Sequence, residues 1–271
     1  KPSRAGRGDR REDIFLNDVD RQDFIKTLAE TCQKTGFQVH PYCLMSNHYH
    51  LVVETPQPTL VAGMKWFLGT YTGRFNRRHK LFGHLFSGRY KSLIVDGSGR
   101  GYLRTVCEYV HLNPARAKLL GPEAPLERFP WSSYGAYLQE PGGRPGWLRV
   151  DRLLGEHGIQ KDSPAGRREF AKRMELRRTE EARSDYRSVR RGWYLGSEEF
   201  AKELIAAAVG HVGPSHSAAR RHETEQEKAE NIVREELERA GWGEEGFFRI
   251  ALTHPSARLA EAMDRLKRFI G

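Results

Sequence analysis

The sequence has few cysteines and no long hydrophobic run, and each shortage excludes a class of protein. Its three cysteines, Cys32, Cys43 and Cys107, are odd in number, far apart and embedded in apolar patterns. We therefore expect neither a disulfide framework nor a zinc knuckle, and a cytoplasmic location fits this cysteine usage best. No stretch of about twenty apolar residues is present, so we expect no membrane-spanning helix.

Two further signals are missing from the sequence. It contains no glycine-rich phosphate-binding loop, so nothing indicates a bound nucleotide. Residues 1–13 are basic and glycine-rich, and they lack the apolar core of a signal peptide.

Acidic residues are also in deficit. The 271 residues include 45 Lys and Arg against 35 Asp and Glu, which gives a net charge of +10 and a pI near 9.6. The positive excess is spread over arginine-rich segments instead of being confined to a tail, which predicts a polyanionic partner. The length allows one large domain or two modest ones.

Residues 37–55 contain two apolar runs separated by the polar pair Ser46 and Asn47, a pattern that predicts a β-hairpin. Side chains alternate along a strand, so His48 and His50 are expected to point the same way. Two neutral imidazoles on a rigid strand provide half of a metal site. The alternative is a pair of ordinary hydrogen-bonded histidines.

A helix is predicted over residues 102–113, where apolar residues recur at helical spacing and Pro114 ends the pattern. Tyr109 and Asn113 would then lie one turn apart on one face. Tyr109 offers a nucleophilic phenol and Asn113 an amide oxygen for a metal. The alternatives are a core tyrosine and an asparagine that terminates the helix. His111 lies on another face, where we expect a structural role.

Four segments, taken together, resemble a known family. They are Tyr-Cys-Leu-Met-Ser-Asn-His-Tyr-His-Leu-Val-Val-Glu-Thr at 42–55, Gly-His-Leu-Phe-Ser-Gly-Arg-Tyr-Lys-Ser at 83–92, Tyr-Val-His-Leu-Asn-Pro-Ala-Arg-Ala at 109–117 and Trp-Ser-Ser-Tyr at 131–134. In this order they resemble the REP-associated tyrosine transposases, a branch of the single-tyrosine HUH transposases, over residues 8–140.

The resemblance implies a chemistry. Tyr109 would attack a DNA phosphate to form a 5′-phosphotyrosine, and His48, His50 and Asn113 would hold a divalent metal. An open site that serves phosphate oxygens and an amide oxygen favours Mg²⁺ or Mn²⁺. The implied partner is single-stranded or hairpin DNA at repeated palindromes. The resemblance leaves two oligomeric states open, a monomer and a homodimer.

The resemblance also implies a fold. The expected class is α+β, with a ferredoxin-like split β-α-β domain and an antiparallel sheet over residues 1–140. Family members carry a strand before the segment that begins at Arg7, and this sequence has no recognisable one there. Either the sheet is one strand short, or residues 2–8 are an altered or truncated start.

Residues 139–146 are rich in turn formers, so we place a domain boundary there and expect a mainly helical region over 141–271. Helical patterns occur at 165–184, 197–209 and 223–240. Longer relatives continue into a helix-turn-helix, which here would be incomplete after Trp242. The alternative is a helical cap that packs on the first domain.

A long amphipathic helix is predicted after Pro58 and Thr59, and cations crowd its end. Alternating cations and aromatic rings suit single-stranded nucleic acid, although one or two such charges would also suit a solvated face. The candidate DNA-binding residues are Arg74, Arg77, Arg78, Arg89, Tyr90 and Lys91.

Three functions follow from the sequence. The first is an active DNA-strand transferase. The second is a DNA-binding relative that has lost cleavage. The third is a metal hydrolase of small phosphoesters, for which a basic surface would have no purpose.

Overall fold

The predicted hairpin carries the histidine pair. In the computed structural model, which describes residues 13–57, 59–86, 90–180, 186, 188–189, 194–209 and 248–254, strand β1 (Gln38–Leu44) pairs antiparallel with β2 (Tyr49–Glu54). The Met45 N–H donates to the His48 carbonyl at 2.8 Å and closes the turn. The hairpin expected around Ser46 and Asn47 is therefore confirmed.

Helix α1 (Asp18–Thr35) precedes the hairpin and is capped at both ends. Its N-cap is Asn17, whose side chain accepts hydrogen bonds from the backbone N–H groups of Val19 and Asp20. Asp20 completes a capping box by accepting from the Asn17 backbone N–H. Gly36, at a φ of 72°, ends the helix.

Helix α2 (Leu60–His79) packs beside α1 over the hairpin. Its buried stripe contains Met64, Phe67, Tyr71 and Phe75, as the helical periodicity predicts. Phe24 of α1 joins the layers: its ring centroid lies 4.7 Å from that of Phe67 and 4.9 Å from that of Tyr49 on β2.

Strand β3 (Lys91–Asp96) leads into α3 (Tyr102–His111), which ends two residues earlier than predicted. Pro114 does not stop the helical course, because a second short helix, α4 (Asn113–Arg116), begins at once and holds the proline in its first turn. A proline is tolerated there because the first N–H groups of a helix have no intrahelical partner. Helix α3 therefore ends before Pro114, as expected, but the proline begins another short helix.

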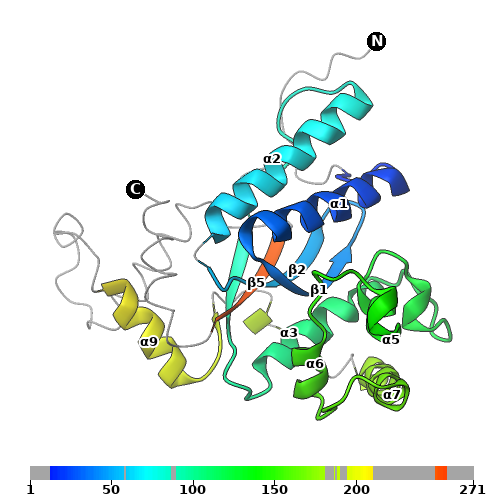
Figure 1. Ribbon diagram of the computed structural model, residues 1–271, viewed down its shortest axis with the longest axis vertical. Helices are drawn as coiled ribbons and strands as arrows, with labels where there is room; N and C mark the ends of the chain where they lie inside the picture. The colour runs from blue at the N-terminus through cyan, green and yellow to red at the C-terminus, as the bar shows by residue number, and fades with distance from the viewer. Residues whose placement is uncertain are drawn as a thin grey trace.

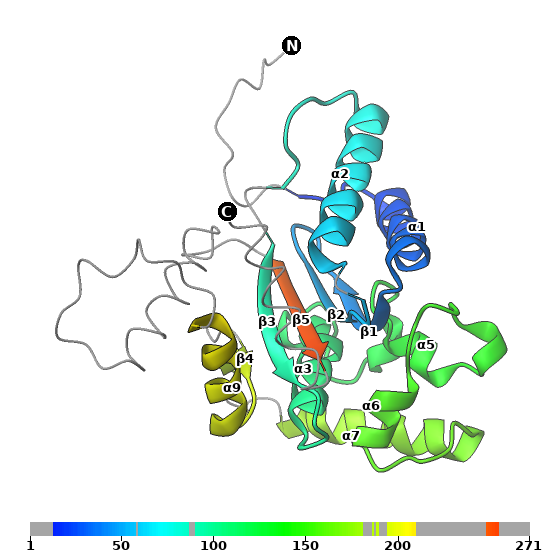
Figure 2. The same ribbon diagram turned by 60° about the vertical axis from the view of Figure 1, so that its left-hand side comes forward.

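Two more strands complete the sheet, β4 (Tyr194–Leu195) and β5 (Phe248–His254). The order is β1-β2-β5-β3-β4, with α1 and α2 on one side and α3 on the other (Figures 1 and 2). Among the strands that the structure describes, only β1 and β2 pair antiparallel, whereas the other three pairings are parallel. The mixed architecture is consistent with α+β, but the expected antiparallel sheet is found only in the hairpin. The ferredoxin-like arrangement stays a prediction.

The parallel pairings arise because β5 lies between β2 and β3. Its sequence, Phe-Arg-Ile-Ala-Leu-Thr-His, mixes β-branched and aromatic residues that favour a strand. The region over 141–271, which we expected to be mainly helical, therefore also contributes strands to the sheet. The helix expected at 223–240 and the candidate N-terminal segment 2–8 lie outside the described residues.

The helices predicted at 165–184 and 197–209 are present as α7 (Pro164–Glu180) and α9 (Glu198–Val209). The shorter helical elements of the described chain are η1 (Leu126–Arg128), α5 (Tyr134–Leu138), η2 (Pro141–Gly143) and α6 (Asp151–Glu156). Phe170 of α7 stacks on Tyr137 of α5 with ring centroids 5.5 Å apart. The core therefore continues past residue 140, and the proposed domain boundary stays a prediction.

All three cysteines are unpaired and buried, as the sequence predicts. Burial raises the pKa of Cys32 to about 12 and also raises the pKa of Cys43 and Cys107. Within the described ranges, no helix is long and apolar enough to cross a membrane.

Candidate active site

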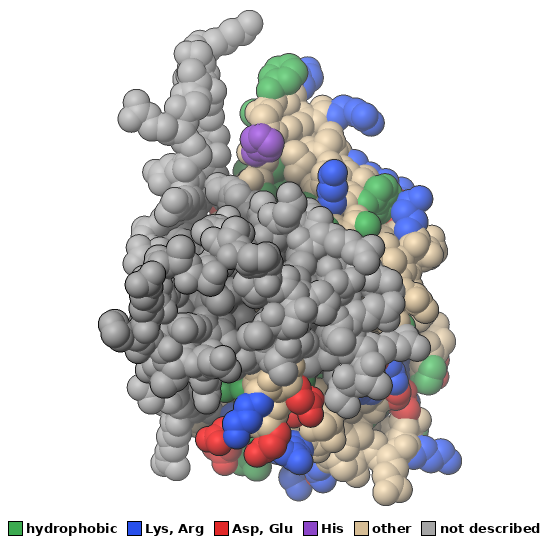
Figure 3. All heavy atoms as spheres, turned by 90° about the vertical axis from the view of Figure 1, so that its left-hand side faces the viewer, with side chains coloured by type: hydrophobic (Ala, Val, Ile, Leu, Met, Phe, Trp, Pro, Cys, Tyr) green, Lys and Arg blue, Asp and Glu red, His purple; other side chains and the backbone are tan. Residues whose placement is uncertain are grey.

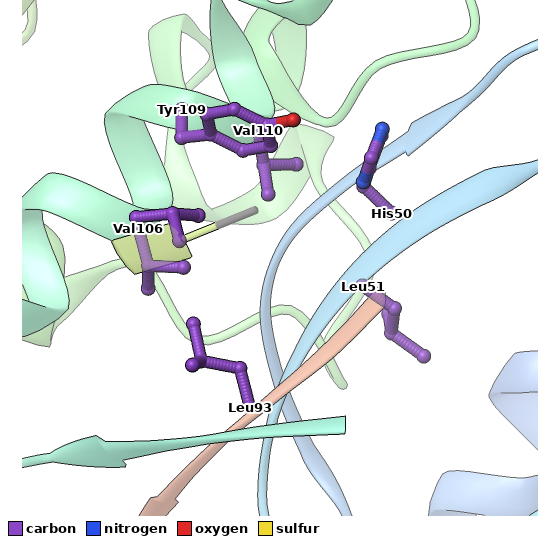
Figure 4. Close-up of a pocket in the computed structure, with 7 residues that line it drawn as sticks. His50, Leu51, Leu93, Val106, Tyr109 and Val110 are labelled. Atoms are coloured by element: carbon purple, nitrogen blue, oxygen red, sulfur yellow. The ribbon is translucent and has the colours of Figure 1, made fainter. Parts of the chain in front are cut away.

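The candidate site lies where β2 faces α3. The rings of His50 and Tyr109 are perpendicular, with centroids 5.6 Å apart. His48 lies beside His50, again perpendicular, at 5.0 Å. Figure 4 shows the Tyr109 hydroxyl at the end of the ring nearer to His50. The strand alternation explains this geometry, because Tyr49 between the two histidines packs on the opposite face against α1 and α2.

Asn113 completes the group. Its side-chain amide lies 2.9 Å from His50 Nε2, with Nδ2 placed to donate. The structure thus brings together all four residues that the sequence proposed as nucleophile and metal ligands. His50, Tyr109 and Asn113 are only 5%, 6% and 7% exposed, so the site is largely closed to water.

A divalent metal at this site would find few donor groups. The described part of the chain contains no group of three or more His, Cys, Asp or Glu residues placed to hold a metal. The available set is therefore two imidazoles and one amide. A half-turn of the Asn113 amide would present its oxygen in place of its nitrogen, and the two are interchangeable in shape. The amide oxygen suits Mg²⁺ or Mn²⁺, whereas the two imidazole nitrogens suit Mn²⁺ or Zn²⁺ better than Mg²⁺.

Arg116 is a site residue that the sequence reasoning missed. Its guanidinium carbon lies 4.0 Å from the centre of the Tyr109 ring, and both terminal nitrogens donate to the Tyr109 carbonyl at 3.2 Å. The available signal was its spacing: Tyr109, Asn113 and Arg116 lie at i, i+4 and i+7, which is one face of a helix. The sequence reasoning did not place Arg116 on the face of Tyr109 and Asn113, because Pro114 was expected to end the helix before Arg116.

A second missed contribution comes from the chain between α7 and β4. The ring of Tyr186 lies 5.1 Å from that of Tyr109, and the Arg116 guanidinium lies 4.9 Å from the Tyr186 ring. Arg177 of α7 donates to the Tyr186 hydroxyl at 3.2 Å and to Glu108 at 2.8 Å. No local sequence pattern signals this contact, because the partners are distant along the chain.

Beside the phenol lies a small apolar hollow, with an empty volume of about 240 Å³. It is lined by His50, Leu51, Leu93, Val106, Tyr109, Val110 and Val189. Figure 4 shows six of these side chains around the hollow, from β2, β3 and α3. Its walls are mostly hydrophobic, so charged groups at its rim act in a poorly hydrated setting.

His111 takes no part in the site. It is 1% exposed, its Nε2 lies 3.1 Å from Ser133 Oγ, and its ring packs 4.8 Å from that of Tyr137. Burial, and to a lesser extent His157, lower the pKa of His111 to about 3, so the ring is neutral at physiological pH. This arrangement agrees with the structural role that we expected.

The candidate DNA-binding residues have different surroundings. Arg74 is held within the protein, since it donates to Thr27 at 2.6 Å and to Glu30 at 2.9 and 3.0 Å. Arg78 lies 3.6 Å from Asp20 and 4.0 Å from Asp23. These two arginines join α2 to α1.

The remaining candidates lie elsewhere. Arg77 is exposed at the end of α2, and Tyr90 is partly buried against the core. Arg89 and the Lys91 side chain lie outside the described residues. A role in DNA binding stays a prediction for all six candidates.

Residues 7–113 match the model of a family described as Transposase IS200 like. The match supports the transposase family. The segment includes the hairpin, α2, β3 and α3, and it ends at Asn113, so it contains the candidate nucleophile and all three candidate ligands. Transposases of this kind suggest DNA transposition or DNA cleavage as the general activity. Searches of curated proteins and of solved structures found no match.

Proposed function

We propose that this chain is a DNA transposase that nicks and rejoins single-stranded DNA at palindromic hairpins, with Tyr109 as the nucleophile. One observation carries the proposal: the Tyr109 ring lies beside His50, which in turn contacts His48 and Asn113, and all four residues lie inside a segment that matches a transposase family. The net charge of +10 suits a polyanionic substrate.

The reaction is a transfer of a phosphodiester bond. The Tyr109 oxygen attacks phosphorus, a bond between that oxygen and phosphorus forms, and the bond from phosphorus to the 3′ oxygen breaks. The phenol loses its proton and the departing 3′ oxygen gains one. The products are a 5′-phosphotyrosine and a free 3′-hydroxyl. Attack by another 3′-hydroxyl reverses the steps and rejoins the strand without a nucleotide cofactor.

Residues of this chain hold the nucleophile. Arg116 places a positive charge over the Tyr109 ring, which favours negative charge on the phenol during attack. Arg116 also donates two hydrogen bonds to the Tyr109 carbonyl, which hold the backbone of the nucleophile. Such fixed placement lowers the entropy cost of reaching the in-line geometry.

His48, His50 and the amide oxygen of Asn113 would hold Mg²⁺ or Mn²⁺. When bound, the cation would polarise the scissile phosphate as a Lewis acid.

A second candidate function is DNA binding without cleavage. The observation in its favour is the burial of Tyr109, which is 6% exposed and covered by Tyr186. A phosphate reaches this phenol only after Tyr186 moves away from it. If Tyr186 stays in place, the basic surface would bind DNA but Tyr109 would not cleave it.

Incubation with single-stranded hairpin oligonucleotides and Mg²⁺ or Mn²⁺ tests the proposal. We expect a denaturant-resistant adduct that requires the metal, disappears in Tyr109→Phe and persists in Tyr102→Phe, a matched change at the start of the same helix. Because the 5′ phosphate stays on the tyrosine, label at the DNA 3′ end should remain on the protein, and label at the 5′ end should not.

Tight DNA binding with no adduct under either metal would rule out cleavage and leave the second candidate. An adduct that survives Tyr109→Phe would assign the nucleophile to another residue.

A further inference from the structure

The turn that follows α2 carries the most exposed aromatic ring in the described part of the chain. Phe82 is 98% exposed, and Leu81 beside it is 39% exposed. This turn lies at the far end of α2, away from the sheet (Figure 1). A phenylalanine held in water has a cost, since burying such a side chain is worth about 2 to 3 kcal/mol. An exposed ring at this position therefore suggests a ligand.

The turn has a defined shape. Asn76 holds it from both sides: its carbonyl accepts from the Leu81 N–H at 2.9 Å, and its side-chain Nδ2 donates to the Gly83 carbonyl at 2.8 Å. Lys80 at a φ of 54° and Gly83 at a φ of 95° reverse the chain direction. The ring of Phe82 thus projects from between two fixed points.

The surroundings of the turn are positive. No aspartate or glutamate occurs between Glu54 and Asp96, and Arg77 and Lys80, which precede Phe82 by five and two residues, are exposed. Asp20 of α1, a buried carboxylate that contacts the end of α2, binds His79 at 2.8 Å. Figure 3 shows Lys and Arg side chains together with hydrophobic ones at the α2 end of the visible face, whereas at the opposite end Lys and Arg are mixed with acidic side chains.

We propose that Phe82 is a stacking platform for an unpaired base of single-stranded DNA, with Arg77 and Lys80 contacting the flanking phosphates. A planar ring among cations fits a nucleobase and its backbone, because every base has a face that stacks and each linkage carries a negative charge. This inference rests on the proposed function and deepens it, since it assigns a place to DNA outside the cleavage site. Duplex DNA, whose bases are already stacked, gains nothing from this ring.

The test uses the full chain and a single-stranded oligonucleotide that contains 2-aminopurine. We expect Phe82→Ala to weaken single-strand binding by roughly 5- to 100-fold in fluorescence anisotropy, and to remove the quenching of 2-aminopurine that stacking causes. Phe82→Trp should keep both signals. The matched control is Leu176→Ala, which removes an apolar side chain that is 60% exposed on α7 and should leave binding unchanged.

Three results would overturn the inference. Equal affinity of Phe82→Ala and Leu176→Ala would show that the ring does not touch DNA. If Phe82→Ala lost as much affinity for duplex DNA as for single-stranded DNA, stacking would be excluded. Dissociation of a dimer by Phe82→Ala, seen in sedimentation, would assign the turn to contact between two copies.

Failure of this inference is separable from failure of the proposed function. At saturating DNA, Phe82→Ala should still form the covalent adduct through Tyr109. If binding depends on Phe82 but no adduct forms in any variant, the stacking site stands and the cleavage proposal fails. If adducts form and Phe82→Ala binds normally, the stacking site alone fails.

Discussion

At the scale of single residues, Arg116 offers the sharpest test of how the phenol is activated. Arg116→Lys keeps the charge but loses the planar group over the ring and the paired donors to the Tyr109 carbonyl. A cation over an aromatic ring is worth about 0.5 to 2 kcal/mol, so adduct formation should slow by roughly 3- to 30-fold in single-turnover measurements at saturating DNA.

Arg128→Lys, at an exposed position on η1, is the control for a general effect of losing a guanidinium. It should leave the rate unchanged. If both variants react at the wild-type rate, the contact between Arg116 and the ring has no role in the chemistry.

Glu54, at the end of β2, links stability to pH. Burial acts to raise its pKa, but the hydrogen bond to His40 and the charges of Arg152 and Arg149 outweigh burial and lower the pKa to about 2. Its ordinary value is 4.5, so the unfolded chain takes up a proton first as pH falls. The stabilisation is complete above about pH 5 and is lost toward pH 2, and it amounts to about 2 to 3 kcal/mol.

Urea unfolding at pH 7 and pH 3 measures this contribution of Glu54 to the free energy of unfolding. Glu54→Gln should be less stable than wild type at pH 7, and the difference should shrink at pH 3. Glu123→Gln, at an exposed position, should match wild type at both. A Glu54→Gln deficit that is independent of pH would mean that the carboxylate charge is not responsible.

At the scale of elements, Tyr186, which follows α7, packs against the candidate nucleophile. Tyr186 covers Tyr109 and is held by Arg177. Tyr186→Ala should expose the phenol and raise the initial rate of adduct formation several-fold, while it lowers the free energy of unfolding by about 3 kcal/mol because a buried ring is lost. Leu176→Ala on α7 should change neither quantity, and a slower reaction in Tyr186→Ala would instead make Tyr186 a residue that positions the phenol.

Elements with strong local patterns could be predicted from the sequence. The hairpin followed from two apolar runs and a polar turn, and the buried stripe of α2 followed from its period. The short helix α4 was missed because the same proline that follows one helix also suits the start of the next. Strand β5 was missed because its two partners lie far away in the sequence, and pairing of this kind leaves no local trace.

The same distinction holds within the candidate site. His48, His50, Tyr109 and Asn113 were predicted to come together, and the structure brings them together. Tyr186 could not be predicted, because only the folded chain sets its ring against that of Tyr109.

At the scale of the whole molecule, the positive charge predicts a binding affinity that falls steeply with salt. Each phosphate contact on a single strand contributes about 0.7 to the slope of log affinity against log salt. Arg77→Gln should reduce that slope by about 0.7, because its side chain is exposed. Arg74→Gln should leave the slope unchanged and lower the free energy of unfolding by about 1 to 3 kcal/mol, because Arg74 is bound to Glu30. Equal slopes for wild type and Arg77→Gln would remove Arg77 from the DNA contact.

The position of β5 has a consequence for the order in which the protein forms. The histidine strand β2 and the strand β3 both leave the ribosome long before β5 is made, yet β5 is the strand that joins them. Until then each presents an open row of backbone N–H and C=O groups, which is a template for pairing with another chain. Nascent chains halted before residue 248 should therefore be the species that chaperones bind and that aggregate at high expression.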